Sequence, residues 1–139
     1  MGGSSFDAPA LVARGERLPG WGRWLNADDL ALVRRMAGRA DIVVENFRPG
    51  AMEKWGLSYE ALSARNPRLI MARVSGFGQT GPYSQRAGYG LIGEAMGGLR
   101  HVTGEPDRPP ARAGISIGDS LAAMHAVMGI TMALHHRAR

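Results

Sequence analysis

Two places in the sequence carry side chains whose type and setting could do chemistry, and the first is Asp119. It stands between Gly118 and Ser120 in the string GISIGDS. A carboxylate there could act as a nucleophile toward an acyl group, because a covalent intermediate divides one difficult transfer into two easier steps. At a helix start, the helix dipole and backbone N–H donors would keep the carboxylate ionised. Taken alone, the same Asp-Ser pair would suit a plain helix N-cap better.

The second place is the string ENFRPG at residues 45–50. It contains an aromatic ring at Phe47 and a cation at Arg48, and Lys54 follows shortly after it. An aromatic ring can stack on another planar group, and cations on a shaped loop can hold an anion through charge-assisted hydrogen bonds. The alternative is a solvated turn in which Phe47 enters the core and the Pro-Gly pair merely bends the chain, and from the residues alone this alternative is preferred for Lys54.

The histidines do not suggest a metal site. No spacing between His and carboxylate residues forms a convincing ligand set, and the chain has no cysteine. His125 lies six residues after Asp119, which is off the same face of a helix. We therefore expect packing or surface roles for all four: His101, His125, His135 and His136.

Helix and strand alternate around the string ENFRPG. Apolar spacing predicts a helix over 27–38, and a short β-branched strand follows at 42–44. A second helix over 58–64 and a second strand over 69–74 repeat the order. The alternation predicts an α/β fold, and residues 45–50 then lie at the carboxyl end of a strand, where open α/β sheets bind ligands.

The second half of the chain is expected to hold a long functional loop and two helices. Gly, Pro, Ser and Tyr crowd residues 75–90, which predicts the loop, and a helical pattern resumes at 91–96. Three prolines in 104–114 predict an exposed connection. The helix predicted over 115–136 is rich in Ala and Met, so we expect other structure to cover most of it.

Longer strings resemble the central segment of the class III CoA-transferases, the CaiB/BaiF family. They are DIVVENFRPGAMEKWGL, GLSYEALSARNPRLIMARVSGFGQTGPY, AGYGLIGEAMGGLRHVTGEP and GISIGDSLAAMHAVMGI. The uncommon strings ENFRPG, NPRLI, SGFGQTGP and GDS occur in the family's order. The resemblance implies a partial Rossmann-like CoA-transferase family III large domain over 25–139, preceded by a poorly matched N-terminal tail over 1–24.

The resemblance implies that the protein moves CoA between an acyl-CoA and a carboxylic acid. Asp119 would attack the acyl-CoA thioester and form a mixed anhydride with release of CoA thiolate. The thiolate would then attack the aspartyl carbonyl and leave an aspartyl-CoA thioester, which the acceptor acid resolves. Coenzyme A, as acyl-CoA, is the only cofactor implied, and no metal is expected.

The resemblance also assigns contacts to CoA. The family's contacts to the cofactor fall on Asn46, Phe47, Arg48, Ala51 and Lys54, with Arg86 as a phosphate contact and Tyr89 beside the pantetheine. The sequence departs from the commoner family pattern at two places. Gly90 stands where an acidic residue is usual, and Glu94 stands where Gln is usual, which bears on the polarity of the site and its acyl preference.

The family consists of longer chains that form interlocked homodimers. The resemblance implies an N-terminal active-site Gln, an Arg for the CoA phosphates and a small domain with a glycine-rich loop, and none of these is recognisable in the sequence. We therefore expect the catalytic machinery to be incomplete in this chain.

Three alternatives remain. The first is a 2-methylacyl-CoA racemase of the same fold family, which we disfavour because no acid follows Tyr89 and no His is adjacent to Asp119. The second is a non-catalytic fragment that binds CoA or dimerises. The third, nucleic-acid binding, rests only on a formal net charge of +5 from scattered Arg residues, so we expect no nucleic-acid partner.

The sequence favours a soluble, cytoplasmic protein. Without cysteine nothing requires an oxidising compartment, and the N-terminal stretch lacks a signal-peptide core. The longest apolar run, Leu121 to Leu134, is interrupted by His125 and is too short to span a bilayer. We therefore expect no membrane partner.

Overall fold

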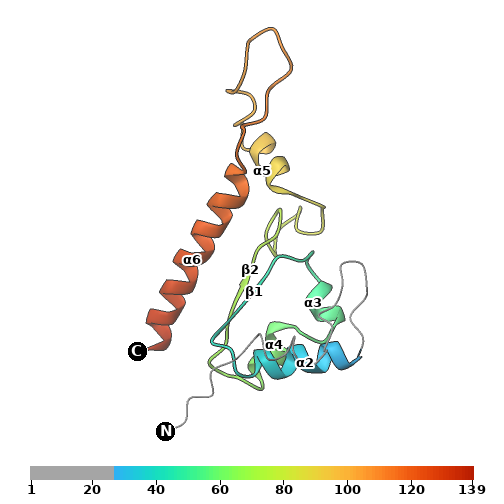
Figure 1. Ribbon diagram of the computed structural model, residues 1–139, viewed down its shortest axis with the longest axis vertical. Coiled ribbons are helices and arrows are strands. Elements are labelled where there is room, and N and C mark those ends of the chain that lie inside the picture. Colours follow the sequence, from blue (N-terminus) through green and yellow to red (C-terminus); the bar gives the residue numbers. More distant parts are fainter. Residues whose placement is uncertain (1–26) are drawn as a thin grey trace, which may run out of the picture. The chain divides into compact units, whose positions relative to one another are not determined.

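The computed structural model describes residues 27–139, so the predicted tail over 1–24 lies outside the described residues. The chain divides into two units, Met1–Val33 and Arg34–Arg139, and the cleft discussed below lies wholly within the second. The helices and strands, labelled in Figure 1, are α2 Ala27–Ala37, β1 Ile42–Glu45, α3 Ala51–Lys54, α4 Tyr59–Ser63, β2 Ile70–Arg73, α5 Gly90–Met96 and α6 Ile117–Arg137.

Strands β1 and β2 form a parallel pair, which confirms the predicted α/β alternation. Their register runs from Ile42 opposite Ile70 to Glu45 opposite Arg73. Two parallel strands need a crossover, and α3 and α4 lie in the segment between them. The carboxyl ends of both strands therefore reach the same edge of the sheet. One detail differs from expectation, because the strand predicted to be buried exposes 61% of Val44.

The buried core belongs to the first half of the described chain. Its apolar members come from α2, from α3 and the turn after it, from α4 and from the entry to β2: Ala37, Met52, Leu57, Leu62 and Leu69. The predicted cap of α4 is confirmed, because the Ser58 side chain accepts a hydrogen bond from the backbone N–H of Ala61 at 3.2 Å. This core fixes the crossover that carries residues 45–50.

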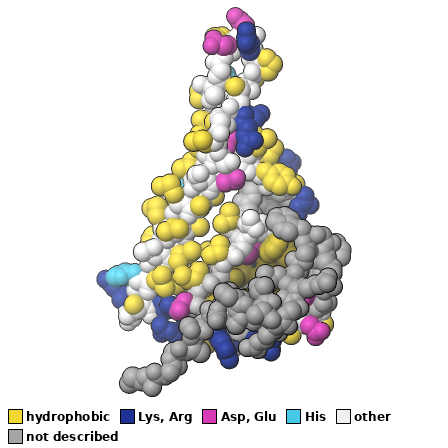
Figure 2. All heavy atoms as spheres, in the orientation of Figure 1, with side chains coloured by type: hydrophobic (Ala, Val, Ile, Leu, Met, Phe, Trp, Pro, Cys, Tyr) yellow, Lys and Arg dark blue, Asp and Glu magenta, His cyan; other side chains and the backbone are white. Residues whose placement is uncertain are grey.

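Helix α6 differs from the prediction that other structure covers it. No residue of α6 is buried, and five of its large apolar side chains are half or more exposed: Leu121, Met124, Val127, Met128 and Met132. Figure 2 shows hydrophobic side chains gathered along this helix. The reason is that, among the elements of the described part of the chain, only α5 and β2 make substantial contacts with it.

The length of α6 also corrects an expectation. The apolar run from Leu121 to Leu134 is by itself too short for a bilayer, but the helix extends from Ile117 to Arg137. By length and composition alone it could cross a membrane, a criterion that core helices of water-soluble proteins also meet.

Candidate active site

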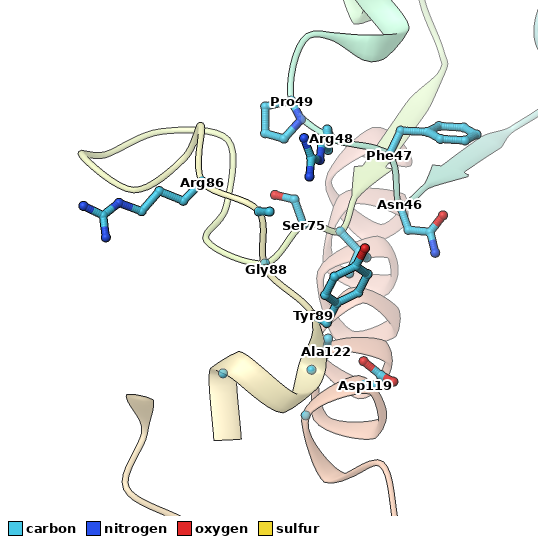
Figure 3. A pocket seen from close by; sticks show the side chains of 16 residues that line it. Asn46, Phe47, Arg48, Pro49, Ser75, Arg86, Gly88, Tyr89, Asp119 and Ala122 are labelled. Atoms are coloured by element: carbon cyan, nitrogen blue, oxygen red, sulfur yellow. The ribbon is translucent and has the colours of Figure 1, made fainter. Parts of the chain in front are cut away.

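A cleft of about 600 Å³ opens where the carboxyl ends of the strands meet the loop after β2 and the start of α6 (Figure 3). Six of the eight predicted site residues line it, and Ala51 and Lys54 on α3 do not. The lining consists of Asn46, Phe47, Arg48, Pro49, Val74, Ser75, Gly76, Arg86, Ala87, Gly88, Tyr89, Gly90, Gly93, Gly118, Asp119 and Ala122.

Asp119 lies in the first turn of α6 and is exposed at the cleft. The interpretation of Asp119 as a plain helix N-cap is wrong, because the N-cap residue is Ser116 and Asp119 lies inside the helix. A carboxylate in the first turn interacts favourably with the positive end of the helix dipole. The Asp119 carboxylate is therefore accessible from the cleft and lies at the N-terminal end of α6.

Glycines allow two backbones to meet beside Asp119. A Cβ atom added to Gly90 would collide with the Asp119 carboxylate oxygen Oδ1, and one added to Gly118 would lie 2.8 Å from the carbonyl oxygen of Gly90. A similar contact occurs deeper in the loop, where a Cβ on Gly88 would lie 2.9 Å from Cα of Gly76. The space around the carboxylate thus depends on the absence of side chains.

Sequence reasoning noted Glu94 but gave it no role. It lies on α5 with only 6% of its surface exposed, and its Oε1 accepts a hydrogen bond from the backbone N–H of Gly118 at 3.2 Å. The other carboxylate oxygen has no partner within the described part of the chain. An acid inside a short, otherwise uncharged helix was the available signal, but only the fold shows its partner.

A buried carboxylate fixes the loop that follows β1. The Oε2 atom of Glu45 accepts a hydrogen bond from the backbone N–H of Phe47 at 2.7 Å, and its Oε1 atom pairs with Nε of Arg73 at 2.7 Å. The Arg73 guanidinium also pairs with Glu53 on α3, at 2.8 Å. We call these three residues, Glu45, Arg73 and Glu53, the loop clamp, because they join both ends of the loop over residues 46–50.

The contacts of the loop clamp shift the pKa of two of its side chains. Its hydrogen bonds to Glu45 and Glu53 raise the pKa of the Arg73 guanidinium. The hydrogen bond from Arg73 is also the main cause that lowers the pKa of the Glu53 carboxyl from its ordinary value of 4.5. Arg73 is thereby committed to protein partners. Its role was not predicted, because the partners are separated by 20 and 28 residues in sequence.

The predicted base-stacking and phosphate-binding side chains remain available. Phe47 is 46% exposed and meets Trp55 edge-on with ring centroids 5.0 Å apart, so the alternative that Phe47 enters the core is wrong. Arg48 is exposed, and its guanidinium has no hydrogen bond or ion pair to the residues that the structure describes. Lys54 is likewise exposed, but it stands outside the cleft lining.

Tyr89 and Arg86 occupy different parts of the loop. The Tyr89 ring is 76% exposed and lies between the loop and α6 on the side of Asp119 (Figure 3). The Arg86 side chain extends away from Asp119 in the same view, and its guanidinium carbon lies 4.3 Å from the centroid of the Tyr83 ring. Such a cation–π contact holds Arg86 at the edge of the cleft.

Comparisons with known proteins establish the family of the chain. Residues 25–139 match the sequence model described as CoA-transferase family III, and the chain therefore belongs to that family. Among its solved relatives is a CaiB/BaiF family protein from Brucella suis, with a TM-score of 0.78 and 46% identity; the match covers 82% of this chain and 30% of that one.

Two curated relatives are named for CoA transfer between acids. A succinyl-CoA–D-citramalate CoA-transferase from Chloroflexus aurantiacus is 65% identical over 109 residues, which are 78% of this chain and 27% of the relative. A succinate–glutarate CoA-transferase from Agrobacterium fabrum is 46% identical over 109 residues, with the same two coverages. The chain thus spans about a quarter of the length of these relatives.

Proposed function

We propose that this chain carries the CoA-binding loop and the nucleophile of a CoA-transferase that moves CoA from an acyl-CoA to a carboxylic acid through an aspartyl-CoA thioester. The observation that carries the proposal is that the Asp119 carboxylate and the loop after β1 share one cleft. Family membership and the names of the curated relatives support the same reaction class.

The reaction balances without an added acid or base. An oxygen of the Asp119 carboxylate attacks the thioester carbonyl, the carbon–sulfur bond breaks, and CoA leaves as a thiolate while a mixed anhydride forms. The thiolate then attacks the aspartyl carbonyl and releases the donor acid as its carboxylate. The acceptor carboxylate then attacks the aspartyl-CoA thioester, which releases the thiolate and forms a second mixed anhydride. The thiolate attacks the acceptor's carbonyl, which forms the new acyl-CoA and restores the Asp119 carboxylate.

The loop after β1 would hold the nucleotide end of CoA. Arg48, with no partner among the described residues, and Lys54 supply positive charge for the phosphates, while the open surface of Phe47 suits the adenine. Asn46 and Ala51 would contact the cofactor from the same segment. The thioester end would then pass Tyr89 on its way to Asp119.

Arg86 would become a further phosphate contact only after leaving the ring of Tyr83. The contact between them is exposed, and such pairs contribute only about 0.5–1 kcal/mol, so a phosphate could displace it.

The relatives suggest the first substrates to test. Both names contain a short dicarboxylic acid, and one contains succinyl-CoA as the donor, so we propose succinyl-CoA with a short dicarboxylate acceptor. We also propose that the natural protein is a cytoplasmic homodimer that needs no metal. Light scattering would give the oligomeric state, and transfer unchanged by a chelator would support the last point.

Trapping the intermediate tests the proposal. The natural protein in which this sequence occurs would be incubated with succinyl-CoA and hydroxylamine, digested and analysed by mass spectrometry. We expect a hydroxamate on the peptide that contains Asp119, dependent on succinyl-CoA and missing from Asp119→Asn. Normal turnover by Asp119→Ala would overturn the assignment. Deuterium uptake into a 2-methylacyl-CoA would instead favour the racemase, although no His lines the cleft in the described part of the chain.

A further inference from the structure

We propose that Glu94 is a positioning residue that holds the first turn of α6 and, through it, the carboxylate of Asp119. Glu94 lies on α5, and α5 packs against α6. Its carboxylate is buried and reaches the backbone of the residue directly before Asp119. This inference rests on the proposed function, because it concerns how the nucleophile of that reaction is held.

The start of α6 needs an external hydrogen-bond acceptor. The first four N–H groups of an α-helix have no partner within the helix, and an N-cap side chain usually satisfies one of them. The N-cap residue Ser116 makes no such side-chain bond. Instead, Glu94 on another helix accepts the N–H of Gly118 at 3.2 Å. A carboxylate at this end also interacts favourably with the helix dipole.

The same short helix contacts α6 at a second point. Gly90 begins α5, one turn before Glu94, and the Asp119 carboxylate lies against its Cα with no room for a side chain. The backbone of Gly118 likewise approaches Gly90 too closely for a Cβ atom. One face of α5 therefore fixes both the amide that precedes the nucleophile and the direction in which the carboxylate points.

Stability alone gives a poor reason for a carboxyl at this position. Its Oε2 atom is buried without a partner among the described residues. A buried polar atom without a hydrogen bond is unfavourable, and one bond made by the other oxygen recovers only part of that loss. An apolar side chain of similar size would fill the space without burying an unpaired oxygen, but it would leave the N–H of Gly118 without this acceptor. Residues that lower local stability typically occur at functional sites. We therefore take the bond with Gly118 as the reason for a carboxyl at position 94.

Two substitutions separate positioning from packing. Glu94→Gln keeps an acceptor oxygen at the same reach, whereas Glu94→Met has similar length but no acceptor. We expect Glu94→Met to lower kcat about tenfold, the effect of one lost hydrogen bond to a reacting segment, with KM for succinyl-CoA unchanged. Glu94→Gln should stay within about threefold of the parent. Met96→Gln, at a 60% exposed position of the same helix, serves as the control.

Amide hydrogen exchange measures the hydrogen bond itself. We expect exchange at Gly118 to rise about tenfold in Glu94→Met and to stay near the parental rate in Glu94→Gln and Met96→Gln. Glu94→Ala provides a second variant without an acceptor should the Met variant fold poorly. Equal kcat losses in the Gln and Met variants would overturn the proposal. So would a lower melting temperature in Glu94→Met with kcat and Gly118 exchange unchanged.

The two proposals fail in different ways. If the parent protein forms no hydroxamate at Asp119, the transferase proposal is wrong, yet exchange at Gly118 still shows whether Glu94 holds α6. If the hydroxamate forms at the parental rate in Glu94→Met, the transferase proposal stands and the positioning role is wrong.

Discussion

The two sides of the cleft are held in place by different physical means. On the side of β1, the loop clamp uses ion pairs between a buried carboxylate, a guanidinium and an exposed carboxylate. On the side of α6, backbones touch through glycines, and one buried carboxyl accepts one amide. The first side presents cations to solvent, and the second presents the carboxylate of Asp119.

The difference matches what each side would have to do under the proposed function. The attraction between a cation and a phosphate falls off only gradually with distance, so a loop held by long side chains would be sufficient for binding. A nucleophile is less tolerant, because a misplacement of about 1 Å can reduce a rate about a hundredfold. Changes on the β1 side should therefore act mainly on CoA affinity, and changes on the α6 side should act mainly on kcat.

The largest expected effect is at the nucleophile. Asp119→Asn should lower transfer by more than about a thousandfold, because an amide cannot form the anhydride. Affinity for CoA, measured by calorimetric titration, should stay within about threefold of the parent, since the cations lie on the other side of the cleft. Asp107→Asn, in an exposed connection, is the matched control. Loss of CoA binding in Asp119→Asn would break the division between the two sides.

Next in size is the glycine contact beside the nucleophile. Gly90→Ala adds a Cβ atom where the Asp119 carboxylate lies, so the carboxylate must move and kcat should fall about a hundredfold. Gly93→Ala is the control, because its Cβ would meet nothing within 4 Å although Gly93 belongs to the same helix and lines the same cleft. Steady-state kinetics of both variants make the test, and equal rates would contradict it.

The loop clamp should affect binding and stability more than chemistry. Arg73→Met leaves Glu45 buried without its charge partner, so the free energy of unfolding should fall by about 3 kcal/mol. The loop would lose its fixed shape, and CoA affinity should weaken about tenfold. Urea unfolding and calorimetry measure the two effects, with Arg65→Met at an exposed position as the control. A kcat loss with CoA affinity intact would reverse the comparison.

The smallest expected effect concerns Glu53 and pH. Its pKa is lower in the folded chain than the ordinary 4.5, so the ion pair with Arg73 adds stability above that pH and loses it as the pH falls through the depressed value. The carboxylate is 42% exposed, so solvent limits the gain to about 0.5 kcal/mol. Urea unfolding of Glu53→Gln should show this loss at pH 7 and a smaller loss once the pH lies below the depressed pKa.

Local patterns predicted the described helices and strands except the short α3, because helix caps and strand periodicity depend on neighbours in sequence. Both strands and the Ser58 cap follow from a few adjacent residues. The exposure of α6 could not be predicted from sequence, since an apolar helix has the same residue pattern whether or not other structure covers it. The pair formed by Glu45 and Arg73 was also beyond reach, because it depends on which residues of two strands stand opposite each other.

The candidate site divides in the same way. Sequence motifs single out Asp119, Asn46 and Tyr89, and all three line one cleft. The bond from Glu94 to Gly118 joins residues 24 positions apart in sequence, and no local rule connects them. The family resemblance thus pointed to the groups that could react, whereas the groups that hold them emerged only from packing.

The pairing of Glu45 with Arg73 also favours the observed register of the two strands over registers shifted by one residue. A slip of one residue would bring Ala72 or Val74 opposite Glu45. The buried negative charge would then have apolar neighbours and no charge partner. Misaligned sheets are therefore strongly penalised, and the carboxyl edge takes its shape only in the correct alignment. The ion pair that would fix the proposed CoA-binding loop therefore also selects the alignment of the two strands.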